Sequence, residues 1–178
     1  MGDELHEFSG VHVGYHQTRS EISRFTKDQI DGEKNFFKAD YSGRDFSHAD
    51  LSRALFAEAN LTGAKFGMAN LIEANFEKAN LAEAELSYSK LLWTHMHSAN
   101  LTSAILAGAN LTGMHAVVAI FHDANLESAN LTGTDLTKAN LAGANLTGAN
   151  LTEARLGGVV LNGTNLRYAK MPDGRIHD

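Results

Sequence analysis

Side chains able to bind a metal ion or a partner gather in one uncharged stretch of the sequence. No residue between Lys90 and Asp123 carries a formal charge. The candidate side chains in this stretch are Trp93, His95, His97, His115 and His122. His95 and His115 are 20 residues apart, and Asp135 follows 20 residues later. Imidazole and carboxylate groups are ligands of zinc and similar ions, but these three residues form a site only if the fold brings residues 20 apart together.

The elements that position these side chains follow from a repeat of five residues. The segment from Ala139 to Leu156 reads ANLAGANLTGANLTEARL, and a large apolar residue recurs at every fifth position from Tyr41 to Leu166, with the one exception of Ala116. About 26 such repeats follow one another without an insertion, so the repeat decides the fold. Two positions before each large residue there is usually alanine, and the residue between them is usually asparagine or aspartate.

Neither a single helix nor a flat sheet accommodates this repeat. On an α-helix a step of five residues turns by about 500°, so the leucines would spiral around every side. On a straight strand an odd step sends successive leucines to opposite faces. Both problems disappear if the chain turns a corner once per repeat, always in the same sense. The repeat therefore predicts an all-β solenoid with the large and small positions inside.

Irregular residues in the interior predict the number of repeats per coil. The small position departs from alanine at Thr94, Met114 and Thr134, which are 20 residues apart, so four repeats form one coil. Bulky Met114 precedes Ala116 where leucine is expected, an exchange that conserves core volume. About seven coils spaced by ~4.8 Å predict a rod on the order of 33 Å long. The residues expected to pack in its core include Phe46, Phe56, Phe66, Phe76, Met96, Met114 and Ala116.

The pattern A-[DN]-L-x-x, repeated from about Asn35 to Met171, resembles the pentapeptide-repeat proteins. The resemblance implies a right-handed quadrilateral β-helix with four repeats per coil. The closing residues MPDGRIHD are similar to those of family members from photosynthetic bacteria. Some members of the family bind DNA gyrase by imitating duplex DNA.

Both ends of the solenoid are expected to carry caps, because an uncovered end exposes core and unpaired backbone groups. Residues 1–34 are predicted to form an N-terminal cap with a short strand near Val11 and a short helix from Ser20 to Gly32. Residues 35–171 are predicted to form the β-helix. In the tail, residues 172–178, a turn is expected to fold Ile176 back over the last coil.

Composition and motifs favour a non-catalytic protein. The 178 residues carry a net charge of −6 and include no cysteine, which suits the cytoplasm and excludes disulfides and thiolate chemistry. No apolar run approaches the roughly 20 residues that span a bilayer, so no membrane contact is expected. The sequence also lacks a phosphate-binding loop, a G-x-S-x-G motif and an H-E-x-x-H motif. We therefore expect neither an enzyme nor a cofactor.

Two functions from different classes remain. The first is a scaffold that binds an unidentified protein partner through the face of Trp93, His95, His97, His115 and His122, as a monomer or an end-to-end dimer. The alternative is DNA mimicry toward gyrase, which requires a strongly negative rod. From Phe37 to Met171 there are 10 Lys and Arg against 12 Asp and Glu, a net charge of only −2, so mimicry ranks second. The absence of a basic stripe argues against direct nucleic-acid binding. A third possibility is a metal site in the column of His95, His115 and Asp135. The uncharged stretch between Lys90 and Asp123 can also be ordinary surface without a binding role.

Overall fold

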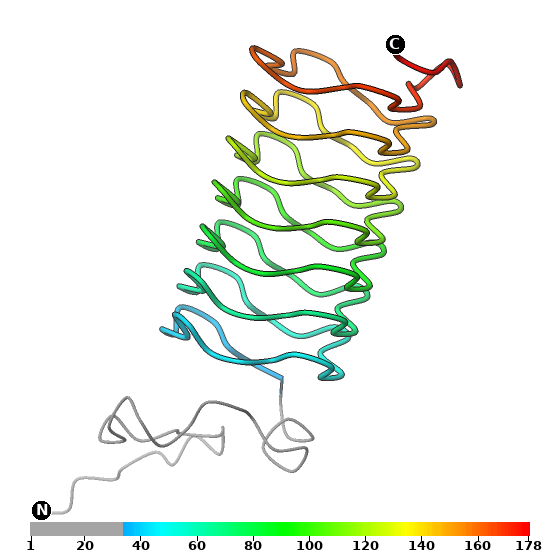
Figure 1. Ribbon diagram of the computed structural model, residues 1–178. Coiled ribbons are helices and arrows are strands. Elements are labelled where there is room, and N and C mark those ends of the chain that lie inside the picture. The colour runs from blue at the N-terminus through cyan, green and yellow to red at the C-terminus, as the bar shows by residue number, and fades with distance from the viewer. Residues whose placement is uncertain (1–33) are drawn as a thin grey trace, which may run out of the picture.

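The chain forms a solenoid of stacked coils. The computed structural model describes residues 34–178, and the stacking is visible along their whole length (Figure 1). One residue on each side of a coil pairs in parallel with the residue 20 positions later, from Asn35 with Leu55 to Asn150 with Lys170. Within residues 34–178 there is no helix, and the β-structure consists of single bridging residues. The predicted coil of 20 residues, with four repeats per coil, is confirmed.

Four columns of bridging residues define the four faces of the solenoid. Face 1 carries residues 75, 95 and 115, face 2 residues 80, 100 and 120, face 3 residues 85, 105 and 125, and face 4 residues 70, 90 and 110. Two corner residues separate one face from the next, as Leu92 and Trp93 separate face 4 from face 1. A side chain 20 residues along the chain therefore lies on the same face or corner, one coil further on.

Every backbone N–H group of a regular repeat has an acceptor, which explains the period of five. In residues 60–64, two N–H groups bind the following coil and one binds the preceding coil. These bonds join Leu61 N to Asn80 O at 2.7 Å, Gly63 N to Ala82 O at 2.8 Å, and Asn60 N to Ala39 O at 2.9 Å. The Ala64 N–H closes the corner on Leu61 O, and the Thr62 N–H binds the Asn60 side chain at 3.3 Å. The polar position thus serves the local backbone, as expected from the sequence.

Each corner requires a left-handed backbone conformation at its second residue. From Lys38 to Tyr168 all second corner residues have positive φ, between 52° and 72°. Glycine adopts this conformation without strain, whereas a residue with a Cβ atom is destabilised by about 1–2 kcal/mol. Val118, with φ of 52°, is the least suited because its side chain is branched at Cβ.

The interior is filled by the large and small positions. The Phe56 ring is completely buried and stacks on Phe76 of the following coil, with ring centroids 4.9 Å apart. Phe46 stacks on Phe66 in the same way at 5.0 Å. The irregular core residues Met96, Met114 and Ala116 are likewise fully buried. The 20-residue register therefore holds for both regular and irregular side chains.

Three polar residues occupy buried small positions without disturbing the core. Each hydroxyl donates to the carbonyl of the large residue three positions earlier: Ser89 to Leu86 at 2.7 Å, Thr94 to Leu91 at 2.8 Å, and Thr134 to Leu131 at 2.8 Å. In residues 34–178 every buried side-chain nitrogen or oxygen has a hydrogen-bond partner. These residues are therefore explained by packing alone.

The two ends differ in what the structure describes. The predicted N-terminal strand and helix lie outside residues 34–178. At the other end Ile176 pairs with Lys170 in antiparallel orientation, and the Tyr168 N–H binds His177 O at 2.8 Å. The tail thus folds back, but along one edge of the last coil rather than over its core. Ile176 remains 58% exposed, which corrects the prediction that it covers the end, and Leu161 and Leu166 stay partly exposed.

Candidate partner-binding surface

The fold separates the five side chains of the uncharged stretch. His95 and His115 lie one above the other on face 1, Trp93 lies on the corner before this face, and His97 lies on the corner after it. His122 occupies the corner between faces 2 and 3, two corners away from Trp93. Its Nδ1 lies 2.9 Å from Ala142 O, and its Nε2 lies 3.2 Å from Asp123 Oδ2. A single flat contact face therefore includes the first four residues but not His122.

The histidine column stacks as the register requires, but its carboxylate is already occupied. The rings of His95 and His115 are 5.4 Å apart and nearly parallel, at 12°. Asp135 Oδ1 accepts hydrogen bonds from the hydroxyl of Thr137 at 2.6 Å and from its N–H at 3.0 Å. The Thr137 hydroxyl, with smaller effects from Arg155 and His115, holds the pKa of Asp135 below its ordinary value. Among residues 34–178 no three His, Asp or Glu side chains are placed to hold a metal ion together.

Trp93 is half exposed, at 53%, and its ring is positioned by a glycine. The ring carbons Cε3 and Cζ3 occupy the space that a Cβ atom would need at Gly113, one coil further on. Tyr88 lies over Gly108 in the same manner, with its Cε1 2.6 Å from that Cβ position. An aromatic ring that covers a glycine on the neighbouring strand shields its backbone from water. Both rings are therefore supported on one side and open to solvent on the other.

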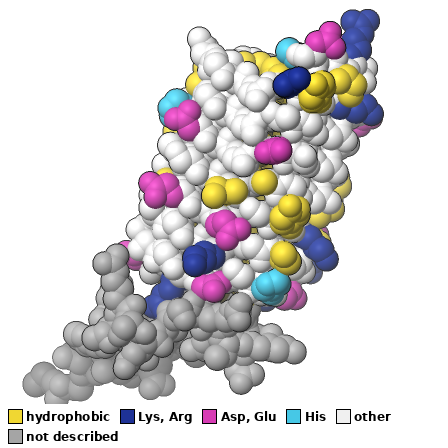
Figure 2. All heavy atoms as spheres, in the orientation of Figure 1, with side chains coloured by type: hydrophobic (Ala, Val, Ile, Leu, Met, Phe, Trp, Pro, Cys, Tyr) yellow, Lys and Arg dark blue, Asp and Glu magenta, His cyan; other side chains and the backbone are white. Residues whose placement is uncertain are grey.

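Exposed and half-buried apolar side chains line both edges of face 4. Met68 and Tyr88 lie on the corner before this face and are 58% and 66% exposed. Ile72, Leu92 and Trp93 lie on the corner after it. We call these five residues the apolar frame, because they enclose Asn70 and Lys90 of face 4. Figure 2 shows one side of this solenoid, on which exposed hydrophobic side chains lie among isolated charged groups.

The apolar frame was not found from the sequence, although a signal for it exists. Ile72 and Leu92 are 20 residues apart, as are Met68 and Tyr88, so each pair occupies one corner column in adjacent coils. The aromatic residues Tyr88 and Trp93 each precede a glycine by 20 residues. Writing the sequence in rows of 20 residues places these apolar positions together.

Lys90 is the one charged residue inside the apolar frame, and it forms no ion pair with any residue in 34–178. Some other basic residues of the N-terminal coils are paired. Arg53 Nε lies 2.8 Å from Glu73 Oε2, and Lys38 Nζ lies 3.3 Å from Glu58 Oε2. The Lys90 side chain is exposed between Asn70 and Asn110. Its ammonium group therefore has no acidic partner among residues 34–178.

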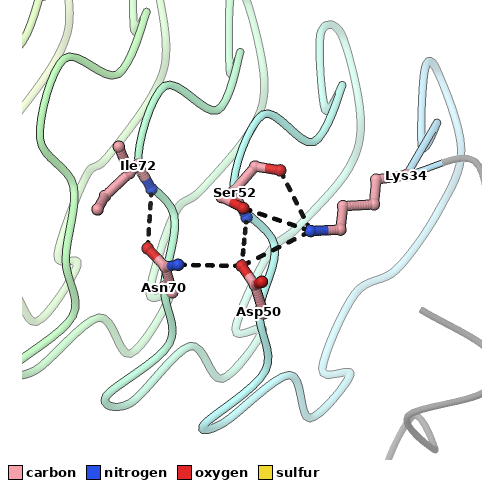
Figure 3. A network of polar contacts seen from close by, with 5 residues as sticks. All are labelled: Lys34, Asp50, Ser52, Asn70 and Ile72. Carbon is pink, nitrogen blue, oxygen red and sulfur yellow. Dashed lines mark hydrogen bonds and ion pairs between the residues drawn. The ribbon is translucent and has the colours of Figure 1, made fainter. Parts of the chain in front are cut away.

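The N-terminal part of face 4 is polar and internally bonded (Figure 3). The Lys34 ammonium lies 3.3 Å from Ser52 O and 3.6 Å from Asp50 Oδ1. Asp50 also accepts from the Ser52 N–H at 3.1 Å and from the Asn70 amide at 3.0 Å. The hydrogen bonds from Ser52, and the nearby charge of Lys34, lower the pKa of Asp50. These polar groups therefore already have partners within the solenoid.

Comparison with known proteins agrees with the repeat. The family model of pentapeptide repeats, with 8 copies, matches residues 43–77, 65–97, 79–115, 119–158 and 144–175. Among curated proteins there is no significant match. Within residues 34–178 no helix is long and apolar enough to cross a membrane.

Solved structures similar to the chain are pentapeptide-repeat proteins as well. HetL, involved in heterocyst differentiation regulation in the cyanobacterium Nostoc sp. Strain PCC 7120, is 26% identical over 80% of this chain and 89% of its own, with a TM-score of 0.27. A protein of the Arabidopsis thaliana thylakoid lumen is 24% identical over 89% of this chain and 78% of its own, with a TM-score of 0.37.

A third structure is a trypsin-treated form of QnrB1, a plasmid-mediated fluoroquinolone resistance protein. It is 23% identical over 74% of this chain and 81% of its own, with a TM-score of 0.42. The family follows from the matched repeats and the 20-residue register. Pentapeptide-repeat proteins form right-handed quadrilateral β-helices, and with these matched repeats the chain belongs to the pentapeptide-repeat family.

Proposed function

We propose that this pentapeptide-repeat protein is a non-catalytic scaffold that binds a partner protein through the apolar frame. The observation that carries the proposal is the exposure of Met68, Tyr88 and Trp93 along the two edges of one flat face. Tryptophan and tyrosine are enriched among the residues that dominate binding energy at protein interfaces. Contiguous exposed apolar side chains on a soluble surface commonly mark an interaction site.

The rigidity of the frame supports the proposal. The Trp93 and Tyr88 rings already rest on Gly113 and Gly108, so little side-chain freedom is lost when a partner covers them. Lys90 supplies a charge in the middle of the frame, and an acidic group on the partner would pair with it. His95 and His97, beyond Trp93, then form a polar rim.

DNA mimicry toward gyrase remains the alternative, and the ion pairs weigh against it. Several acidic residues of the solenoid are paired with a basic neighbour: Asp50 with Lys34, Glu58 with Lys38, Glu73 with Arg53, Glu77 with Lys78, and Asp135 with Arg155. Such pairs cancel much of the negative field that imitation of a DNA duplex needs. A supercoiling assay with purified gyrase decides this point, because mimicry requires inhibition or protection from a quinolone drug.

The oligomeric state and the location are parts of the same proposal. Leu161 and Leu166, partly exposed in the last coil, give an end-to-end dimer an apolar contact, whereas a monomer leaves them in solvent. Sedimentation over a range of concentrations distinguishes the two. A cytoplasmic location, which the cysteine-free sequence favours, stays a prediction.

The scaffold is tested by affinity capture from the native host with matched variants. The first variant is Trp93→Glu. Glutamate fits this position, because Glu73 and Glu153 occupy the same corner column with the same left-handed backbone. The second variant is Tyr88→Ser, because Ser128 occupies the same corner column as Tyr88 with the same backbone conformation. Ser103→Glu, on the corner between faces 2 and 3, adds the same charge away from the frame.

We expect a protein captured by the wild type and by Ser103→Glu to be lost from both frame variants. The captured protein is then purified, and its affinity for the four proteins is measured by calorimetry. Equal affinity for the wild type and both frame variants would show that the frame is not the contact surface. Circular dichroism of all variants confirms that the solenoid is intact.

A further inference from the structure

Asn162 is the one asparagine of the repeats that is followed by glycine rather than by a large apolar residue. With Gly163 it forms the single Asn-Gly pair of the sequence. The other asparagines of the repeats occupy the polar position, where the next residue is large and faces the interior. Asn162 and Gly163 instead form an exposed corner between faces 2 and 3 of the last coil, and Gly163 has a φ of 72°. No side chain at residue 163 shields the peptide bond between them.

The backbone nitrogen of Gly163 is also free, unlike the equivalent nitrogen one coil earlier. The Gly143 N–H donates to Asn162 O at 2.9 Å, as second corner residues do throughout the regular coils. Beyond Gly163 the chain turns into the tail, which pairs with residues 168–171 on another side of the coil. Within residues 34–178 the Gly163 N–H therefore makes no hydrogen bond.

The side-chain amide of Asn162 is free as well. It forms no hydrogen bond within the described residues, whereas the nearby Asn165 accepts from the Arg167 N–H at 3.1 Å and donates to Thr147 at 2.9 Å. Asp173 and Gly174 form a similar pair in the tail, but the Gly174 N–H is bonded to Met171 O at 2.8 Å. Only at Asn162 do an unhindered amide carbon and an unbonded following nitrogen occur together in residues 34–178.

We propose that Asn162 is a site of spontaneous deamidation, with water as the co-reactant. Hydroxide removes the proton of the Gly163 N–H, and the nitrogen attacks Cγ of Asn162. The Cγ–Nδ2 bond breaks and the amide leaves as ammonia, taking a proton from water, so a five-membered succinimide joins the two residues. Water then opens either C–N bond of the ring. The products are aspartate, with the original backbone, and isoaspartate, in which the backbone runs through Cβ.

The modification changes the end of the solenoid in two ways. It adds a negative charge at the corner of the last coil. In the isoaspartate form it also lengthens the backbone by one carbon beside Leu161, whose side chain is already partly exposed. Because the last coil is paired on one side only for most of its length, we expect this change to loosen that coil and to leave the buried coils intact.

The test uses the full chain, incubated at mildly alkaline pH and digested with trypsin at intervals. Cleavage after Arg155 and Arg167 releases residues 156–167, which contain Asn162 and Asn165. We expect this peptide to gain the mass of an NH₂-to-OH exchange at Asn162, to split into two chromatographic forms, and to keep Asn165 unmodified. Asn162→Gln should abolish the change. A chain that retains its amide at Asn162, while the free peptide of the same sequence deamidates, would overturn the proposal.

A matched variant separates the structural cause from the dipeptide itself. Ala142→Asn creates the same Asn-Gly pair at the same corner one coil earlier, where the Gly143 N–H is hydrogen-bonded. Since a backbone hydrogen bond must break before the nitrogen can attack, we expect this new site to react at least about five-fold more slowly than Asn162. Equal rates at the two sites would refute the role of the free Gly163 nitrogen. Circular dichroism before incubation confirms that the variant is folded.

Discussion

Truncation of Phe66 to alanine should destabilise the N-terminal coils strongly, whereas replacement by leucine should have a much smaller effect. Phe66 is completely buried, stacks on Phe46 at 5.0 Å, and contacts Phe56 and Phe76 edge to face at 5.8 and 6.1 Å. Removing a buried phenylalanine side chain to Cβ lowers the free energy of unfolding by about 3–5 kcal/mol. The same large position holds Leu86 in the following coil, so leucine fits the column.

The expected loss for Phe66→Leu is about 1–2 kcal/mol, because the volume is nearly kept while the ring contacts are lost. Urea unfolding followed by circular dichroism measures both variants. With a denaturant slope of about 1–3 kcal/mol per molar urea, Phe66→Ala should lower the midpoint by about 1 M or more. Hydrogen exchange should show the loss of protection concentrated in residues 46–86, because coils contact only their neighbours.

Two results would refute this reasoning. If Phe66→Ala and Phe66→Leu lowered the midpoint equally, the packing of the ring column would not be the source of stability. If the alanine variant lowered the free energy of unfolding by less than about 1 kcal/mol, the coils would have closed around the missing ring, which a close-packed interior does not permit.

Three further perturbations have defined outcomes. Gly113→Ala should displace the Trp93 ring, because the added Cβ meets its Cε3 and Cζ3 atoms, and the shift in tryptophan fluorescence should be absent in Gly133→Ala, which has open space. Val118→Asn should raise the free energy of unfolding, measured by urea titration, by about 1 kcal/mol, because asparagine tolerates the left-handed corner better than a β-branched residue. An unchanged free energy of unfolding would show that the corner at Val118 is unstrained. Because the pKa of Asp135 is lowered in the folded state, its stabilising effect is present above the unfolded value of about 3.9 and is lost as the pH falls through the folded value. Asp135→Asn, which keeps the acceptor for Thr137, should therefore weaken the fall of the urea midpoint below about pH 4, and an unchanged pH profile would contradict this assignment.

The coil register was predictable because irregular residues recur with it. Thr94, Met114 and Thr134 occupy one inward column, and a column is where the volumes of neighbouring coils must be adjusted to one another. The role of the polar position was predictable for a similar reason. An asparagine such as Asn60 precedes each corner, where one N–H has no backbone acceptor and a side-chain oxygen two residues earlier can reach it.

The surface that we propose for partner binding could be predicted only in part from the sequence. Residues near Trp93 in the sequence do not all lie near it in space. His122 is nearly one and a half coils further along the chain, and it therefore lies on another side of the solenoid. Conversely, Met68 and Tyr88 lie on the corner across face 4 from Trp93, but in the sequence they occur in stretches that contain charged residues. Thr137 and Arg155 already contact the oxygens of Asp135, the carboxylate of the metal hypothesis, and such competition depends on side-chain directions that the repeat does not specify.

The order of residue types alone determined the coil, because a step of five with alternating inward and outward positions is compatible with a chain that turns one corner per repeat. It also determined which side chains form the core. Only the tertiary structure decided which outward side chains share a surface, how the tail meets the last coil, and where a backbone nitrogen such as that of Gly163 is left without a partner. These features depend on contacts between neighbouring coils and on where the stacking stops, and a local repeat contains no information about either.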